Sequence, residues 1–380
     1  MHFVAIGDIG PLDGMLHVGD EAMTEALVLE LQARGVDRLT AISSNVADTR
    51  ERYGIEAVEG LGFTADREHN ERLLAAGVSG SVREAVERAD AVVVAGGGNM
   101  TSIWPSHVYT RAALGRLAAS VGVPFVVSGQ TIGPQLNERD RELVSEMLRS
   151  SALFGVRESD SLALCSSLGT TPSLNADDAS FLADLTESRE PLPPIPYALV
   201  SLSTHTAEYD KQAFVTALAE LLDEVARHAA VIFSAHFAPL NGPPRGDELM
   251  HERVRAAMTQ PSGVVRVQDS ATSAKLARGA ELVISSRYHP VVFAVSGGVP
   301  SIGIPVDDYT TTKLSGALGN FGQSSLLPIA ALLAGDGSDL FFDVWQARAL
   351  IRERGLAEAA VQRAASAAWW DRVATAPESR

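Results

Sequence analysis

The chain has 380 residues, 46% of them hydrophobic, so it can bury a full core and exceeds the size at which one core usually stops growing. Its formal net charge of -16, from 47 acidic and 31 basic residues, argues against general nucleic-acid binding, which needs clustered lysines and arginines. A single cysteine, Cys165, excludes a disulfide framework and a cysteine metal site.

No run of the sequence is long and apolar enough to span a bilayer, and the first residues lack the pattern of a signal peptide. We therefore expect a soluble, cytoplasmic protein without a transmembrane segment. Composition leaves open a peripheral association with a membrane through a lipid-linked substrate. It does not fix the oligomeric state.

Short apolar runs alternate with helical patterns in the first half of the chain. Strands are expected at 3–6, 39–43, 91–95, 124–128 and 153–157, and helices at 19–33 and 83–88. The uninterrupted apolar run at 91–95 is typical of a parallel strand covered on both faces. The alternation predicts a doubly wound α/β domain over residues 1–190.

A proline-rich segment, 187–196, ends this first domain because its four closely spaced prolines stiffen the chain. The alternation then resumes, with strands expected at 197–202, 230–234, 264–267, 282–285 and 301–304, and helices at 211–228 and 247–258. We expect a second α/β domain over 191–338. Two Rossmann-like domains facing each other across a cleft, with ligands at the carboxyl ends of the strands, are the simplest architecture.

The last segment, 339–380, has a helical pattern and carries Trp369 and Trp370 near its end. An aromatic pair at this place is better explained as a packing anchor than as a ligand platform. We therefore expect C-terminal helices that pack back on the first domain.

Glycines and polar side chains follow three successive strands of the first domain. Gly97, Gly98 and Asn99 come after the strand at 91–95 and predict a loop that wraps closely around a ligand. Gln130 and Arg157 follow the next two strands. Because the carboxyl ends of parallel strands share one edge, these residues are expected to line a binding crevice.

The helix expected at 19–33 begins with Gly19, Asp20 and Glu21. A helix amino terminus offers backbone N–H groups to an anion, and glycine lets a ligand approach. The glycine spacing does not match the dinucleotide-binding fingerprint. Taken alone, Asp20 and Glu21 are explained as first-turn residues that stabilise the helix dipole.

Arg287, Tyr288 and His289 follow the apolar run at 280–284. A permanent cation beside a titratable imidazole suits an anionic substrate that gains or loses a proton. An isolated Arg-x-His is also explained by an arginine–carboxylate pair and a core histidine. The remaining histidines, among them His236 at a strand end, are too scattered for a metal site, and we expect neither a metal nor a cofactor.

An ordered set of motifs resembles the polysaccharide pyruvyl transferase family over most of the chain. The motifs are Gly-Asp-Glu-Ala at 19–22, Gly-Gly-Gly-Asn at 96–99, Gly-Gln-Thr-Ile-Gly-Pro at 129–134, Val-Arg-Glu-Ser-Asp-Ser at 156–161, Ala-Asp-Asp-Ala at 176–179, Ser-Arg-Tyr-His at 286–289 and Gly-Val-Pro at 298–300. The resemblance implies a two-domain fold of the GT-B type. It also implies transfer of the enolpyruvyl unit of phosphoenolpyruvate, as a co-substrate, onto a sugar, usually as a cyclic pyruvate ketal.

Arg157 and Arg287 match the positions of the family's donor-binding arginines, which implies a clamp on phosphoenolpyruvate from opposite sides of a cleft. Two arginines suit this ligand because each can form paired hydrogen bonds with its carboxylate or phosphate. The resemblance also places Tyr288 and His289 at the donor.

Ketal formation needs a general acid that protonates the terminal methylene carbon. His289 is the first candidate for this acid and for contact with the leaving phosphate, and the sequence does not separate the two roles. Asp20 or Glu21 is the alternative acid, or a base toward the acceptor hydroxyl.

A sugar acceptor, lipid-linked or not, is expected to contact residues from several segments: His17, Gly97, Gly98, Asn99, Gln130 and His236. His17 precedes Gly19 where the family commonly has other residues, so it is either an acceptor contact or a loop histidine without function. The family's lysine after the last strand is displaced here to Lys313, whose role stays open.

Two other functions fit the same fold. One is a GT-B glycosyltransferase that uses a nucleotide-sugar, and the other is a non-catalytic, glycan-binding member of the family. The sequence does not identify the acceptor sugar, its hydroxyls or the stereochemistry of the ketal.

Overall fold

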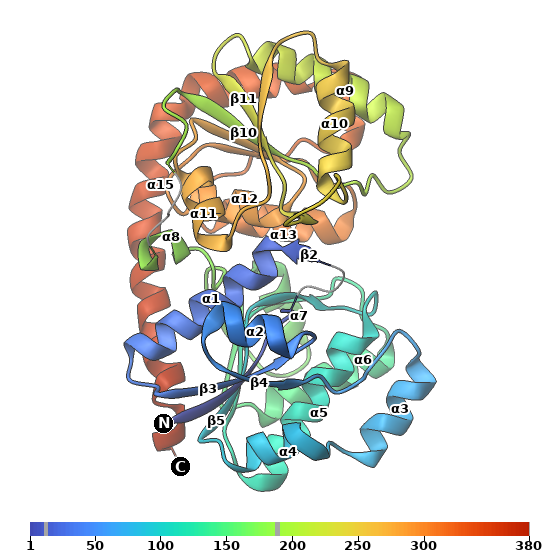
Figure 1. Ribbon diagram of the computed structural model, residues 1–380, viewed down its shortest axis with the longest axis vertical. Helices are drawn as coiled ribbons and strands as arrows, with labels where there is room; N and C mark the ends of the chain where they lie inside the picture. The colour runs from blue at the N-terminus through green and yellow to red at the C-terminus, as the bar shows by residue number, and fades with distance from the viewer. Residues whose placement is uncertain (11–13, 187–190, 380) are drawn as a thin grey trace. The chain divides into compact units, whose positions relative to one another are not determined.

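The computed structural model describes residues 1–10, 14–186 and 191–379, and its chain forms two compact units (Figure 1). Unit 1 comprises Met1–Leu12, Met23–Ala179 and Ala364–Arg380, and unit 2 comprises Asp13–Ala22 and Ser180–Arg363. Within the described residues, no helix is long and apolar enough to cross a membrane.

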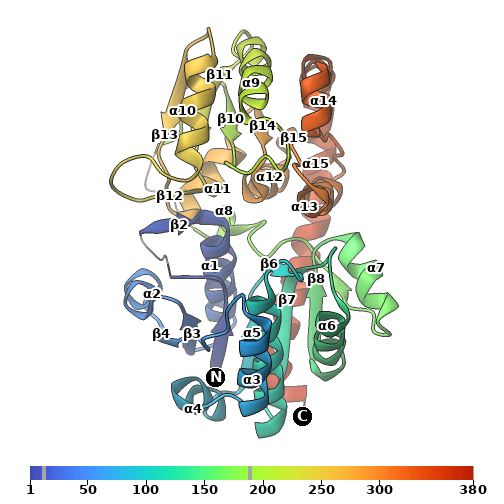
Figure 2. The ribbon, with the colours of Figure 1, turned by 90° about the vertical axis from the view of Figure 1, so that its right-hand side faces the viewer.

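Unit 1 contains a parallel sheet with the strand order β4-β3-β1-β5-β7-β8-β9, and β6 pairs with β7 (Figure 2). Its strands are β1 (His2–Ile6), β3 (Arg38–Ser43), β4 (Glu56–Glu59), β5 (Ala91–Val94), β6 (Gly97–Met100), β7 (Phe125–Ile132), β8 (Leu153–Val156) and β9 (Ser173–Leu174). Its helices are α2 (Val46–Tyr53), α3 (Arg67–Ala76), α4 (Gly80–Glu87), α5 (Pro105–Val121), α6 (Glu138–Ser150) and α7 (Ser159–Ser167), with most of α1 (Val18–Ala33).

Both faces of the unit 1 sheet are covered because successive side chains of a strand point to opposite faces. In β5, Val92 and Val94 belong to the core formed with α4, α5 and α6. Ala91 and Val93 belong to the opposite core, formed with α1 and the end of the last helix. Unit 1 is therefore doubly wound, as the continuous apolar run at 91–95 predicts.

Unit 2 contains a parallel sheet with the order β13-β11-β10-β14-β15 and a separate antiparallel pair, β2 with β12. Its strands are β2 (Met15–His17), β10 (Tyr197–Ser201), β11 (Ala230–Ser234), β12 (Phe237–Pro239), β13 (Ser262–Val265), β14 (Leu282–Ser285) and β15 (Ser301–Gly303). Its helices are α8 (Leu182–Leu185), α9 (Lys211–Val225), α10 (Asp247–Ala257), α11 (Ser270–Arg278), α12 (Tyr288–Val295), α13 (Asp308–Gly319), α14 (Ile329–Ala334) and most of α15 (Gly337–Ala374), which a short 3-10 turn, η1 (Ala376–Ser379), follows.

The bounds of the two compact units differ from the domain boundaries expected at residues 190 and 338. Residues 14–22 and 180–186 belong to unit 2 rather than unit 1, and unit 2 continues to Arg363. The first segment joins unit 2 because β2 pairs with β12 and because the backbone N–H of Val18 donates to the carbonyl of His236 at 3.0 Å. Of the predicted linker at 187–196, residues 187–190 lie outside the described residues.

The predicted C-terminal segment is a single helix, α15, shared between the units. Its first turns are part of unit 2, where Phe341 and Val344 are buried in the core. Its last turns belong to unit 1, as predicted, and bury Trp369 and Trp370 against the sheet. The indole Nε1 of Trp369 also donates to Ser128 Oγ at 2.9 Å, which ties the helix to strand β7.

Replacement of Trp370 by alanine should destabilise unit 1 by about 3 to 5 kcal/mol, because it leaves a large cavity in a close-packed core. Trp370 is 1% exposed. Denaturant unfolding monitored by circular dichroism measures the change. Val361 on the same helix is 64% exposed, so Val361→Ala is the control and should change stability by less than about 0.5 kcal/mol. Equal effects of the two substitutions would contradict the packing role of the tail.

Candidate functional site

The carboxyl edge of the unit 2 sheet carries the chemistry-bearing residues of the second half of the chain. His236 follows β11 and Arg287 follows β14, and these strands flank β10. Tyr288 and His289 then begin α12. The structure thus places three of the predicted donor residues together at the edge where ligands bind to parallel α/β sheets.

Asp247, the first residue of α10, holds this edge together. Its carboxylate is fully buried and accepts from Arg287, with Nε 3.0 Å from both oxygens and Nη2 2.5 Å from Oδ1. It also accepts the backbone N–H groups of His236 at 3.1 Å and Phe237 at 2.9 Å. Burial raises the pKa of Asp247, and the Arg287 charge opposes that rise. One carboxylate therefore fixes both the arginine and the loop after β11.

Sequence reasoning missed Asp247. An aspartate in the first turn of a helix is usually explained by the helix dipole, which gives no reason to pair it with an arginine 40 residues later. The pairing with Arg287 is the arginine–carboxylate alternative that the sequence left open. It engages Nε and Nη2, and the Arg287 side chain is still 28% exposed.

Gly19 lies directly against the ring of His289. A Cβ atom added at Gly19 would be 1.8 Å from His289 Nδ1. Any side chain there would displace the imidazole or the first turn of α1. The glycine of the Gly-Asp-Glu-Ala motif is thus explained by its contact with the Ser-Arg-Tyr-His motif, and both belong to unit 2.

The other residues of the α1 entry surround this contact. His17 packs on Phe237 with ring centroids 4.1 Å apart, and its Nδ1 is 3.6 Å from Asp20 Oδ2. The Asp20 side chain is 28% exposed, whereas Glu21 is only 3% exposed. Of the two predicted acid or base carboxylates, Asp20 is thus the one that solvent or a substrate can reach.

Lys313 of α13 lies beside Tyr288. Its Nζ is 4.9 Å from the Tyr288 ring centroid and 4.7 Å from that of Tyr309, the geometry of cation–π contacts. It also donates to the Tyr309 hydroxyl at 3.1 Å. Lys313 therefore adds a second cation next to the Arg-Tyr-His segment, although the sequence left its role open.

Arg157, predicted to contact the donor, lies inside unit 1 and is 1% exposed. Its guanidinium bonds Asp177 at 2.5 Å, Glu158 at 3.1 Å and Thr131 at 2.9 Å. The structure therefore places Arg157 in a buried network with two carboxylates, where it does not face solvent.

The neighbouring Asp178 explains two of the glycine motifs. Its carboxyl group accepts from the backbone N–H of Gly96 and from Ser128 Oγ, both at 2.9 Å. A Cβ on Gly129, whose φ is +47°, would lie 2.7 Å from Asp178 Oδ1. Glycine is needed at both strand ends because the aspartate packs against their backbone.

The loop predicted at Gly97 and Gly98 is a strand instead. Gly97–Met100 forms β6, which pairs with β7 (Figure 2). A Cβ on Gly97 would lie 3.1 Å from Gln130 Oε1, so the glycine accommodates a buried side chain. Gln130 is itself fully buried and donates to the carbonyl oxygens of Ala95 and Ser128. Of the predicted acceptor contacts, Gly97 and Gln130 thus pack against each other within the sheet.

Asn99 belongs to a polar cluster that the sequence did not assemble. Its Nδ2 donates to Asp8 Oδ2 at 2.5 Å, and Arg111 and His107 Nδ1 lie 3.1 and 3.0 Å from Asp8. Burial raises the pKa of Asp8, but Arg111 and His107 outweigh burial and lower it well below its usual range. Asp8 is therefore an ionised carboxylate at neutral pH.

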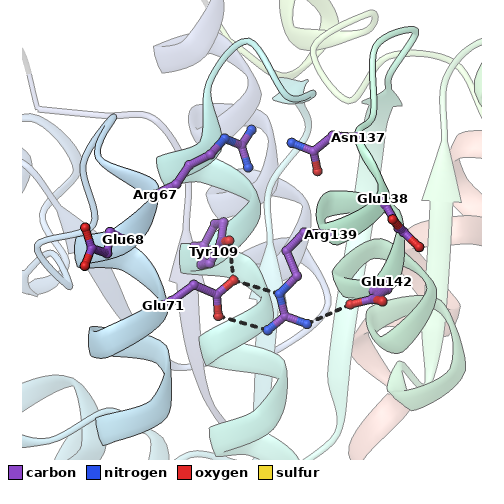
Figure 3. A pocket seen from close by; sticks show the side chains of 8 residues that line it. All are labelled: Arg67, Glu68, Glu71, Tyr109, Asn137, Glu138, Arg139 and Glu142. Atoms are coloured by element: carbon purple, nitrogen blue, oxygen red, sulfur yellow. Dashed lines mark hydrogen bonds and ion pairs between the residues drawn. The ribbon is translucent and has the colours of Figure 1, made fainter.

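A pocket of about 500 Å³ opens on unit 1 between α3, α5 and the start of α6 (Figure 3). Its lining has two arginines and four glutamates: Arg67, Glu68, Glu71, Tyr109, Asn137, Glu138, Arg139 and Glu142. Arg139 is paired with Glu71 at 2.7 Å and with Glu142 at 2.9 Å. The excess of carboxylates makes this pocket unfavourable for a polyanion. Among the residues described, no group of three or more His, Cys, Asp or Glu side chains is placed to hold a metal ion.

The family model for polysaccharide pyruvyl transferase matches residues 17–308. The chain belongs to the polysaccharide pyruvyl transferase family. The matched residues include Gly19 and His289, which are in contact, and the pair Arg287 and Asp247. No curated protein matches the chain in sequence.

Solved structures similar to this member of the family share its fold at low sequence identity. A UDP-GlcNAc 2-epimerase from Neisseria meningitidis, bound to UDP-GlcNAc, is 12% identical with a TM-score of 0.61, covering 94% of each chain. UGT89C1 from Arabidopsis thaliana, complexed with quercetin, is 11% identical with a TM-score of 0.59, covering 99% of each chain. The calicheamicin glycosyltransferase CalG4 is 16% identical with a TM-score of 0.56, covering 99% of this chain and 98% of CalG4. The fold is thus of the GT-B type, as predicted.

Replacement of Gly19 by alanine should destabilise the protein by about 1 to 3 kcal/mol, because the methyl group overlaps the His289 ring. Denaturant unfolding measures the loss. Gly319→Ala is the matched control, since a Cβ there meets no heavy atom of the described residues within 4 Å. In a helix it should be neutral or stabilising by up to about 1 kcal/mol. A neutral Gly19→Ala would contradict the contact.

Burial and the Asp177 charge raise the pKa of Asp178 to about 7. In the unfolded chain the Asp178 carboxyl has a pKa of about 4. Its protonated form therefore stabilises the folded protein fully below that pH, and this stabilisation is lost as the pH rises through about 7. Asparagine does not titrate. Between about pH 5 and pH 8, wild type should therefore lose about 2 to 3 kcal/mol relative to Asp178→Asn. Urea unfolding at both pH values measures this difference, and a pH-independent difference would rule out the shifted carboxyl.

Proposed function

We propose that the protein transfers the enolpyruvyl unit of phosphoenolpyruvate to sugar hydroxyls, and that the carboxyl edge of the unit 2 sheet binds the phosphoenolpyruvate. The observation that supports this most is the contact of Gly19 with His289. It joins two family motifs that are far apart in the sequence but lie within one unit. His289 is also only two residues from Arg287. Family membership supplies the class of reaction.

The local charges favour this ligand. The protein has a net charge of -16, so an anionic substrate needs local cations. Arg287 offers a planar guanidinium that Asp247 holds in a fixed orientation. Lys313 provides an ammonium group over the Tyr288 ring. Phosphoenolpyruvate carries its charge on a carboxylate at one end and a phosphate at the other, which suits two separate cations.

The proposed chemistry has two additions to C2 of phosphoenolpyruvate. A proton adds to C3, which becomes the methyl group, and the first acceptor hydroxyl bonds to C2 and loses its proton. The bond from C2 to the phosphate oxygen then breaks, and phosphate leaves with the electron pair. The second hydroxyl bonds to C2 and its proton leaves on inorganic phosphate. Two hydroxyl protons are thus replaced by two C–O bonds, and one proton each goes to carbon and phosphate.

His289 is the residue we assign to the proton of C3 or to the leaving phosphate. Its ring is held between Gly19 and Phe293, whose ring centroid is 5.9 Å away. Asp20 is the base that we assign to an acceptor hydroxyl, because its carboxylate is more accessible than that of Glu21. General acid or base residues of this kind contribute about 100- to 10,000-fold to the rate.

The acceptor in this proposal is a sugar of a glycan or glycan precursor with two hydroxyl groups that can close a ring on C2. His17 lies next to Asp20 and is half exposed, so it is placed to contact such an acceptor. Asn99 and His107 form a second polar group in unit 1, around Asp8. A lipid carrier on the sugar is compatible with these contacts.

The variants Arg287→Lys and His289→Asn should each lower phosphate release from phosphoenolpyruvate, measured with a panel of sugar acceptors, by about 100-fold or more. Lysine keeps a positive charge beside the buried Asp247, so the fold should be retained. Arg227→Lys is the control, because the Arg227 side chain is 62% exposed, follows the end of α9 and pairs with Glu224. Wild-type turnover by both site variants would remove the basis for this site.

A ligand screen separates the proposal from a nucleotide-sugar glycosyltransferase. Phosphoenolpyruvate should raise the melting temperature of the wild-type protein, and uridine diphosphate should raise it less. Mass spectrometry of the sugar product should show the added pyruvate ketal. Stabilisation by uridine diphosphate alone would favour the glycosyltransferase.

A further inference from the structure

The ring of His236 is buried without a hydrogen-bond partner. His236 is 5% exposed, and neither Nδ1 nor Nε2 has a partner among the residues that the structure describes. The two other buried histidines differ. His251 Nε2 accepts from the backbone N–H of Leu202 at 3.0 Å, and both nitrogens of His2 have partners. A buried polar group without a partner is destabilising, so this ring needs an explanation.

The position of the ring does not depend on a bond of its own. The backbone N–H of His236 donates to Asp247 Oδ2 at 3.1 Å, and its carbonyl accepts from Val18 N at 3.0 Å. Asp247 also holds Arg287. The carboxylate that orients Arg287 therefore also fixes the backbone that carries the imidazole.

The ring is kept neutral. Burial lowers its pKa well below the usual value, and the neighbouring His289, Arg287 and His251 lower it further. A neutral imidazole keeps one N–H donor and one acceptor nitrogen. The ring lies 6.0 Å from Phe293, which also contacts the ring of His289.

Two serines at the same edge also have buried side chains without a hydrogen-bond partner among the described residues. Ser201 ends β10 and Ser234 ends β11, and the hydroxyl of each is buried without a partner among the described residues. β10 and β11 are adjacent strands. Three unpartnered polar side chains therefore lie at or just after the carboxyl ends of two adjacent strands, the edge where polar ligands bind to such sheets.

We infer that His236 is a substrate-binding residue whose neutral ring donates its N–H to an anionic oxygen, phosphate or carboxylate, of the substrate that Arg287 holds. A neutral donor suits this place because a further cation beside Arg287 and His289 would be unfavourable, whereas an N–H still binds an anion. The identity of the whole substrate rests on the proposed function. Binding of an anion at His236 does not, and inorganic phosphate or pyruvate can stand for that anion in a test.

The test uses four versions of the full chain: wild type, His236→Phe, His236→Asn and His236→Gln. Phenylalanine keeps the ring and removes the donor, whereas asparagine and glutamine restore an N–H near the positions of Nδ1 and Nε2. His69→Phe is the matched control, because His69 lies on α3 of unit 1. Binding of phosphoenolpyruvate, inorganic phosphate and pyruvate is measured by calorimetry, and KM and kcat by phosphate release.

His236→Phe should raise KM for phosphoenolpyruvate by about 10- to 100-fold and change kcat by less than about threefold, the effect of losing one hydrogen bond to a charged group. Either asparagine or glutamine should recover most of the affinity. Loss of binding to phosphate but not pyruvate identifies the phosphate as the partner, and the reverse identifies the carboxylate. Unchanged binding of all three ligands by a folded His236→Phe overturns the inference. A bound water would then be the partner of the ring nitrogens.

A direct measurement covers the case in which His236→Phe does not fold. In wild type, the ring ¹⁵N resonances of His236, identified from the variants that fold, should shift on addition of inorganic phosphate or pyruvate. The absence of any shift overturns the inference. A wild-type protein that binds phosphate at His236 but never turns over phosphoenolpyruvate would contradict the proposed function and leave the inference standing.

Discussion

The buried carboxylate of Asp247 is the constraint on which the candidate site depends. It binds the guanidinium of Arg287 and two backbone N–H groups of the loop after β11. An isolated carboxylate could not remain ionised at this depth, so the arginine and the amides are as necessary to the aspartate as the aspartate is to them. Asp247 thus fixes the orientation of Arg287 through Nε and Nη2. The rest of the guanidinium is left for a ligand.

The same constraint reaches the amino-terminal segment. The loop that Asp247 fixes continues into β12, and β12 pairs with β2, which leads directly into Gly19 and Asp20. Gly19 then allows His289 to lie against the first turn of α1. The Asp20 carboxylate, the His289 imidazole and the Arg287 guanidinium thus come together through one pair of three-residue strands, so these short elements are part of the site.

The sequence predicted the parallel strands well because runs such as 91–95 carry their own signal, and motif order identified the family. It could not predict the pairing of β2 with β12, since three residues show no periodicity and their partners are distant in the chain. It predicted a loop at Gly97 because glycine commonly marks turns, whereas Gln130 required glycine there for packing. The burial of Arg157 depends on tertiary structure, which brings it together with Asp177.

The division of the chain between the units has a consequence for its synthesis. β2 has no partner until Phe237 has left the ribosome, so the amino-terminal part of the site waits while all of β3 to β11 is made. Unit 1 is likewise incomplete until Trp369 and Trp370 have been made and cover its sheet. Both units therefore stay incomplete while the intervening residues are synthesised, and the apolar surface that they expose meanwhile is prone to aggregate.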